Sequence, residues 1–258
     1  MKCIFCKEDS SSSKSIEHII PESLGNTEHV LPPSVVCEKC NNYFARKIEK
    51  PFLESPFIVH LRNRQEIVNK RGIIPPRSAL YLDAGIQVNI DDQDLSIYPS
   101  KESDVDRFIT TLLTRKRGTL ISLLHHPKPD SYLTARFIGK IAIEALAHRF
   151  IQASLTYEEI IENKELDPLR SFVRYGNSSE QSWEYNEREI YIEDKIFHEN
   201  GSYYQLLHQF MFLQMASNET IFIIAFFGTE YAMSLDRNII QGYRDWLAKN
   251  HDKSPLYP

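Results

Sequence analysis

The sequence predicts an α+β protein in which a small N-terminal module, held together by its cysteines, precedes a larger domain of helices and antiparallel strands. All four cysteines lie within the first 40 of the 258 residues, as two Cys-x-x-Cys pairs. A helical apolar pattern follows the second pair, and the rest of the chain mixes helical patterns with short runs rich in β-branched and aromatic residues. We therefore expect two domains, residues 1–56 and residues 57–258.

The composition is that of an ordinary globular chain, with 42% apolar and 25% charged residues. Lys and Arg number 30 and Asp and Glu 35, which gives a net charge of −5, so a nucleic acid would have to be bound by local basic clusters. The longest fully apolar run, residues 221–227, is far shorter than the roughly 18 residues of a membrane span. We expect no membrane partner and, without a signal-peptide pattern, a cytoplasmic location.

The four cysteines, Cys3, Cys6, Cys37 and Cys40, have the spacing of ligands of one structural zinc ion. Each Cys-x-x-Cys turn presents two thiolates, and two such turns fill the four positions of a tetrahedral Zn²⁺ site. A redox dithiol is disfavoured because the pair occurs twice. A disulfide framework is disfavoured by the missing signal peptide.

The segment between the cysteine pairs predicts a short strand that ends at Pro21, followed by turn and loop residues at 25–26 and 32–33. After Cys40, three aromatic or aliphatic residues recur at i+4 spacing and predict a helix that ends at about Glu49, before Pro51. The module should therefore contain two strands and a helix.

Three polar residues of this module, Glu17, His18 and Asn41, suit metal-assisted hydrolysis of a phosphodiester. Carboxylate and amide oxygens are hard ligands for Mg²⁺, and an imidazole with a near-neutral pKa can deprotonate water. Each residue alone also has an ordinary explanation. Glu-His at a strand end is usually a solvated pair, and Asn early in a helix is usually a cap.

Taken in order, Cys-x-x-Cys, Glu-His-Ile-x-Pro and Cys-x-x-Cys-Asn-Asn resemble the His-Asn-His (HNH) endonuclease family, whose core is the ββα-metal fold. The resemblance covers about residues 1–55. It implies that His18 is the general base, that Glu17 and Asn41 bind a catalytic Mg²⁺ or Mn²⁺, and that the four cysteines bind structural zinc. At the position of Glu17 the family commonly has Asp, and at the position of Asn41 it often has His.

The favoured hypothesis is therefore an endonuclease that hydrolyses DNA, as in bacterial restriction or anti-phage defence; that context rests on family analogy alone. A non-catalytic zinc module that binds nucleic acid or protein is the alternative from another class. A third hypothesis is an endonuclease that hydrolyses RNA, because a histidine base and one metal ion do not by themselves distinguish ribose from deoxyribose.

Beyond the module, His60, Arg62 and Arg64 alternate on a stretch that reads as a strand, and we interpret them as a candidate phosphate-contacting strip. A solvated polar face is the alternative explanation of the same pattern. The three residues are the nucleic-acid-binding candidates of the sequence.

The remaining patterns predict a hairpin around residues 91–94, a long helix over 133–154, a β-meander over 189–228 and a closing helix near 239–247. Residues 170–176 look like the start of a polar loop. Within the same resemblance, residues 140–147 and 170–176 look like features of longer proteins with an N-terminal HNH module. We expect the second domain to dock substrate, form a homodimer, bind a protein partner or sense a signal.

Overall fold

The computed structural model describes residues 1–69, 71–122, 126–176, 182–199 and 201–257. Its helices and antiparallel sheets confirm the predicted α+β class. The chain forms two compact units, residues 1–52 with 130–258 and residues 53–129. This division differs from the predicted one, because the segment from residue 130 onward packs with the N-terminal module. A module of about 50 residues is too small to bury a sufficient core by itself.

The N-terminal module has the predicted two strands and helix. Strands β1 (Glu17–His18) and β2 (Val30–Leu31) pair antiparallel, with Glu17 opposite Leu31. A short 3₁₀ helix, η1 (Glu22–Leu24), lies between them. The helical segment then runs without a break through α1 (Glu38–Phe44), the π-helical η2 (Ala45–Glu49) and α2 (Lys50–Leu53).

This helical segment continues past Pro51, whereas the sequence predicted an end at about Glu49. The reason is the π-helical turn before the proline, in which the Lys50 N–H bonds to the Ala45 carbonyl. The turn shifts the bonding register just ahead of Pro51, whose nitrogen has no hydrogen to donate. The buried face of the segment follows the predicted i+4 spacing, with Cys40, Phe44, Ile48 and Phe52 each at most 1% exposed.

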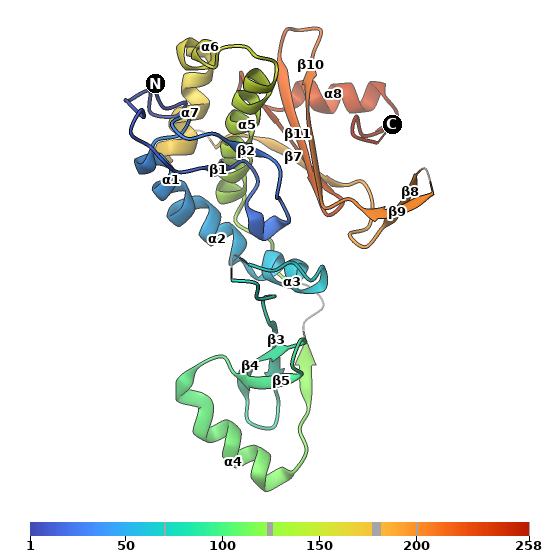
Figure 1. Cartoon of the computed structure of the whole chain (residues 1–258). Helices are drawn as coiled ribbons and strands as arrows, with labels where there is room; N and C mark the ends of the chain where they lie inside the picture. The colour runs from blue at the N-terminus through green and yellow to red at the C-terminus, as the bar shows by residue number, and fades with distance from the viewer. Residues whose placement is uncertain (70, 123–125, 177–181, 200, 258) are drawn as a thin grey trace. The chain divides into compact units, whose positions relative to one another are not determined.

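Helix α5 (Ser131–Gln152) confirms the predicted long helix and lies at the centre of the first unit (Figure 1). The side chain of its N-cap, Asp130, accepts hydrogen bonds from the backbone N–H groups of Tyr132 and Leu133. The helix contacts β2 and η2 of the module as well as β12 of the C-terminal sheet. Phe137 stacks on Phe52, with ring centroids 3.9 Å apart. Module and sheet therefore share α5 as a common packing surface.

Residues 170–176, expected to start a polar loop, are helical instead. Two short helices, α6 (Glu158–Glu162) and η4 (Lys164–Leu166), lead into α7 (Asp167–Tyr175), which has Pro168 in its first turn and Gly176 in the left-handed region after its last residue. Proline in the first turn of a helix and glycine just after its end both favour a helix, so the predicted loop is wrong. Helix α7 packs on both α5 and α1.

The β-meander predicted over 189–228 is confirmed in part: β10 and β11 lie in that range, but their antiparallel sheet, with the strand order β10-β11-β12-β7, also includes strands over 185–189 and 229–234. Its strands are β7 (Tyr185–Glu189), β10 (His208–Gln214), β11 (Thr220–Phe226) and β12 (Thr229–Ser234). A separate hairpin joins β8 (Ile196–Glu199) and β9 (Ser202–Gln205). The closing helix α8 (Gln241–Lys249) buries Tyr243 and Leu247 against one face of the sheet.

The second unit is an antiparallel sheet with two helices. Its helices are α3 (Pro56–Arg64) and α4 (Val105–Arg115), preceded by the 3₁₀ turn η3 (Glu102–Asp104). Its strands are β3 (Arg77–Tyr81), β4 (Ile86–Asp91), β5 (Ser96–Pro99) and β6 (Leu120–Ser122), in the order β5-β4-β3-β6. Asp91 pairs with Ser96, which confirms the predicted hairpin.

The strand expected for His60, Arg62 and Arg64 is wrong, because these residues lie on helix α3. Pro56 fixes the backbone at the first helical position and favours a helix from there. Spacing of two residues puts side chains on one side of a strand but on different sides of a helix. Arg62 is accordingly 7% exposed, and burial lowers its pKa. His60 packs against the ring of His126, and Arg64 is exposed.

Among the described residues, no helix has both the length and the apolar character that crossing a bilayer requires.

We expect Gly139→Val to destabilise the first unit. A Cβ at this position of α5 would lie 2.8 Å from a methyl carbon of Val173 on α7, so the two helices could not keep their separation. Overpacking of this kind costs about 1–3 kcal/mol. Ala248→Val on the exposed face of α8 is the matched control, and thermal unfolding is the measurement. Equal unfolding temperatures for the two variants would show that α5 and α7 do not pack as described.

Candidate active site and zinc site

The four cysteine sulfurs form one cluster. The Sγ atoms of Cys3, Cys6, Cys37 and Cys40 all lie within 4.8 Å of one another, and none forms a disulfide. The Sγ atoms of Cys6 and Cys37 are 3.6 Å apart. Tetrahedral zinc with Zn–S bonds of about 2.3 Å requires sulfurs about 3.8 Å apart. The cluster therefore has the composition and the size of a four-thiolate zinc site.

The thiols of this cluster interact strongly with one another. A hydrogen bond from Cys40 is the main reason that the pKa of Cys3 falls to about 5. The same interaction raises the pKa of Cys40, and burial raises the pKa of Cys6 to about 11. One thiolate among the four sulfurs is therefore favoured by the protein itself. A bound zinc ion would deprotonate all four.

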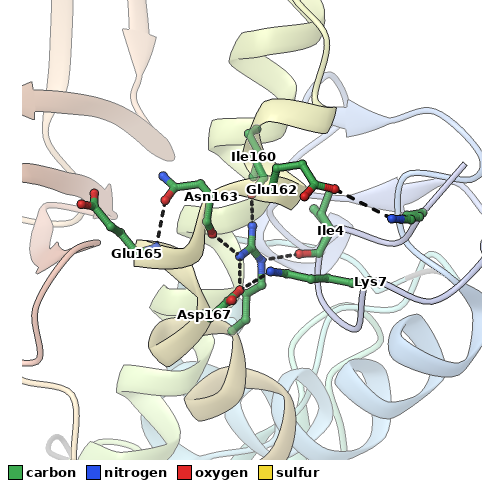
Figure 2. Close-up of polar contacts among 9 residues, drawn as sticks. Ile4, Lys7, Ile160, Glu162, Asn163, Glu165 and Asp167 are labelled. Carbon is green, nitrogen blue, oxygen red and sulfur yellow. Dashed lines mark hydrogen bonds and ion pairs between the residues drawn. The ribbon is translucent and has the colours of Figure 1, made fainter.

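Two arginines of α7 support the cysteine turns from outside the module. The Arg174 Nε donates to Cys40 Sγ at 3.2 Å, and the Arg170 Nε donates to the carbonyl of Ile4, inside the first Cys-x-x-Cys turn, at 2.8 Å. Figure 2 shows the surroundings of this second contact, where Asp167 also forms an ion pair with Lys7 at 2.5 Å. The segment at 170–176 thus belongs structurally to the cysteine site.

Figure 2 further shows how carbonyl groups gather around the same guanidinium. Arg170 donates to Asp167 at 2.6 Å, to the carbonyl of Asn163 at 2.8 Å and to the carbonyl of Ile160. Burial lowers the pKa of Arg170, while Asp167 opposes that shift. The arginine joins α6, η4 and α7 to the N-terminal turn and is 2% exposed.

Strand β1 presents Glu17 and His18, the predicted metal ligand and general base. The His18 Nε2 lies 3.0 Å from Oε1 of Glu22. Because an ionised carboxylate only accepts hydrogen bonds, Nε2 carries the hydrogen of this contact. In the neutral imidazole the lone pair is then on Nδ1. That nitrogen is shielded from solvent and has no hydrogen-bond partner in the described part of the chain.

Asn26 braces the loop that joins β1 to β2. It is completely buried, and its amide donates to the carbonyls of Ile20 and His29 at 2.7 and 3.0 Å. Its Oδ1 accepts from the backbone N–H groups of Glu28 and His29. All four bonds go to backbone atoms, so this side chain fixes the strand pair that carries Glu17 and His18. The sequence indicated only a turn at this position.

Glu17 is 5% exposed and forms a buried ion pair with Lys140 of α5, 123 positions later in the chain. The Lys140 Nζ lies 2.6 Å from Glu17 Oε1, 2.6 Å from Glu49 Oε1 and 2.9 Å from Glu144 Oε2. It also donates to the carbonyl of His18 at 3.3 Å. The sequence alone predicted no activity for Lys140 or Glu144. The structure places both beside the candidate site.

The protonation states within this cluster follow from burial and charge. Burial disfavours the charged ammonium, but the attraction of Glu144, Glu17 and Glu49 outweighs it and raises the pKa of Lys140 well above its ordinary value. Burial also raises the pKa of Glu144 well above its ordinary value, against the attraction of Lys140. Lys140 therefore stays cationic, and burial disfavours the ionised form of Glu144.

Asn41 lies on α1 directly after Cys40 and is partly exposed. Its backbone N–H bonds to the carbonyl of Cys37. Within the described ranges, no hydrogen bond joins its side chain to Glu17 or His18. Glu17 and His18 are consecutive residues of β1, and convergence of their side chains with Asn41 stays a prediction.

A basic stripe follows the exposed side of the same helical segment. Lys39, Arg46, Lys47 and Lys50 recur at helical spacing and, with Asn42, Tyr43 and Arg174 of α7, line an open hollow of about 690 Å³. No carboxylate contributes to this lining. The Arg174 guanidinium lies 4.1 Å from the centre of the Tyr43 ring, an attractive cation–π contact. The sequence analysis did not find this stripe, although its spacing was visible.

The donors around β1 fit a hard divalent cation in their chemistry. Glu17 supplies a carboxylate and Asn41 an amide oxygen, and the unpartnered nitrogen of His18 lies on the same strand as Glu17. Lys140 engages Oε1 of Glu17.

Comparison with known proteins identifies the module. Residues 3–57 match the family model described as HNH endonuclease. The match includes the four cysteines, Glu17, His18 and Asn41. No curated protein matches the chain, and no solved structure does.

We expect purified protein to contain about one zinc ion per chain and Cys37→Ser protein to contain much less. Loss of a structural zinc removes folding free energy directly, so the unfolding free energy should fall by several kcal/mol. Elemental analysis and thermal unfolding are the measurements, with Ser12→Ala, an exposed serine between the two cysteine pairs, as the control. Purified wild-type protein that contains no zinc, or Cys37→Ser protein that unfolds at the wild-type temperature, would exclude the structural zinc site.

Proposed function

Because residues 3–57 carry an HNH endonuclease module, we propose that this protein is a metal-dependent endonuclease that hydrolyses phosphodiester bonds of DNA. The orientation of His18 is the observation that carries the proposal. Glu22 accepts a hydrogen bond from the Nε2–H group, so the lone pair is on Nδ1, which has no partner among the described residues. A general base needs this combination of a fixed ring and a free nitrogen.

In the proposed reaction, Nδ1 of His18 accepts a proton from the water that attacks phosphorus. Glu22 holds the ring in the required tautomer and stabilises the imidazolium that forms. Asn26 keeps the β1–β2 loop in place through its four backbone contacts. The four cysteines hold zinc as a structural ion, because a site with four sulfur ligands has no open position.

Glu17 and Asn41 are the residues that would hold a catalytic Mg²⁺ or Mn²⁺. When bound, such an ion supplies positive charge at the leaving 3′ oxygen. Glu17 is one methylene longer than Asp, so its carboxylate reaches further from β1. The contact with Lys140 fixes that longer side chain.

The basic stripe of α1, η2 and α2 supports a nucleic-acid substrate. From Lys39 to Lys50 the stripe extends over about 17 Å, which is the axial length of about five base pairs. It begins two positions from Asn41, so phosphates bound along it would be close to that residue. We propose this stripe, with Arg174, as the main phosphate-binding surface. His60 and Arg64 stay a second candidate in the other unit.

The alternative of a non-catalytic zinc module gives no reason for the fixed orientation of His18 or for the buried charge cluster around Glu17. RNA stays an alternative substrate, because contacts to phosphates do not distinguish RNA from DNA. A role in restriction or anti-phage defence in the bacterial cytoplasm, with a homodimer or a protein partner, extends the proposal by family analogy.

We expect the wild-type protein to cut or nick plasmid DNA in Mg²⁺ or Mn²⁺ and to be inactive in EDTA. His18→Ala should lower kcat by about 10²–10⁴-fold, the usual contribution of a general base. Glu17→Gln and Asn41→Ala should raise the metal concentration needed for half-maximal activity. His198→Ala, an exposed histidine on β8, is the matched control. Undiminished cleavage by His18→Ala, or by metal-free protein, would refute the proposal.

We expect Arg46→Glu with Lys47→Glu to weaken binding of a DNA duplex. Loss of two phosphate contacts should also lower the slope of log affinity against log salt concentration by about 1.8. Fluorescence anisotropy in a His18→Ala background separates this binding from cleavage.

Lys249→Glu with Lys253→Glu makes the same charge change at the exposed C-terminal helix and the residues after it, and serves as the control. His60→Glu with Arg64→Glu tests the predicted strip in the second unit. An unchanged affinity for the Arg46 and Lys47 variant would exclude the stripe as the DNA surface, and the same assay with RNA duplexes and single strands compares substrates.

A further inference from the structure

Lys140 is a buried cation that the proposed chemistry does not use directly. It belongs to α5, outside the residues matched by the HNH family model, yet its Nζ contacts two adjacent residues of β1. Its side chain is completely buried. Water therefore does not compete for its hydrogen bonds, and the protein acceptors alone determine its position.

The geometry around Nζ is over-determined. An ammonium has three hydrogens, and four protein oxygens lie within 3.3 Å of it. Two of the acceptors are the Glu17 carboxylate and the His18 carbonyl. A third, Glu49, lies on the helical segment that also carries Asn41. Lys140 Nζ thus contacts both β1, which carries Glu17 and His18, and the helical segment that carries Asn41.

A purely structural role explains this arrangement poorly. Burying charges costs free energy that apolar packing does not, and a buried ion pair is often no more stable than an apolar replacement. Here one ammonium faces three carboxylates, so the cluster also keeps surplus negative charge in the interior. A structural link between α5 and the module would need a single carboxylate. The additional contacts converge on Glu17 and His18.

We propose that Lys140 is a positioning residue of the nuclease site, which fixes the Glu17 carboxylate and the backbone of His18 and so supplies from α5 a part that residues 1–57 lack. This inference rests on the proposed nuclease function. Lys140 acts through Glu17 and does not touch the DNA. Its loss should therefore slow the chemical step and leave DNA binding unchanged.

The test is a double-mutant cycle on the full chain, with Lys140→Met, Glu17→Gln and the double variant. Lys140→Met should lower kcat about tenfold or more, while KM for DNA stays within about twofold. In the Glu17→Gln background, removal of Lys140 should lower kcat no further, because the carboxylate that it positions is already gone. Residues that act as a unit show such non-additivity.

Arg188→Met is the matched structural control. Arg188 pairs with the buried Glu230 in the C-terminal sheet, with Nε 2.6 Å from Oε1, so its loss also leaves a buried carboxylate without its cation. Arg188→Met should lower the unfolding temperature without lowering kcat. If Lys140→Met does not fold, Lys140→Met with Glu144→Gln removes one carboxylate along with the cation, so that the net charge of the cluster stays as in wild type, and is used in the same cycle.

The outcomes separate the positioning role from the function on which it rests. Three results would overturn the role of Lys140 alone, provided that wild type shows His18-dependent cleavage. They are additive losses of kcat in the cycle, a loss of kcat no larger than that of Arg188→Met, and a change confined to KM. Absence of His18-dependent cleavage in wild type would overturn the nuclease proposal and the positioning role together. Non-additive loss of kcat at constant KM supports both.

Discussion

Lys140 has its ammonium where water does not reach it, so the four oxygens around it determine how α5 and the N-terminal module are joined. Two of these oxygens belong to the strand that carries Glu17 and His18, and one belongs to the helical segment after the second cysteine pair. Loss of the Lys140 cation alone would leave buried carboxylates without a counter-ion, which is strongly destabilising in a protein interior. The candidate site is therefore held by residues far apart in the sequence.

The zinc site depends on the same interface. Two Cys-x-x-Cys turns bring their sulfurs together, but Arg174 contacts Cys40 and Arg170 contacts the backbone of Ile4 from α7. Gly139 allows α7 to approach α5 closely enough for both arginines to reach. A module of about 50 residues buries too little apolar surface to stand alone. Zinc and the contacts with α5 and α7 add the stability that the small core of the module does not provide.

The secondary structure that the sequence predicted correctly has strong local causes, and the errors have specific ones. The long helix over 131–152 and the two strands at 208–226 follow from regular apolar patterns. The errors arose at prolines. Pro56 and Pro168 start helices where we expected a strand and a loop, and Pro51 lies within a helical segment because the π-helical turn before it changes the bonding register.

The sequence by itself determined the cysteine pairs, the order of Glu17, His18 and Asn41 and the resemblance to HNH endonucleases, because these depend on short spacings within one module. Only the tertiary structure decided which groups surround them. The pairing of Glu17 with Lys140 joins positions 123 residues apart, and the grouping of residues 1–52 with 130–258 is equally long-range. Local spacing carries no information on such contacts, since they depend on how α5 and α7 pack against the module.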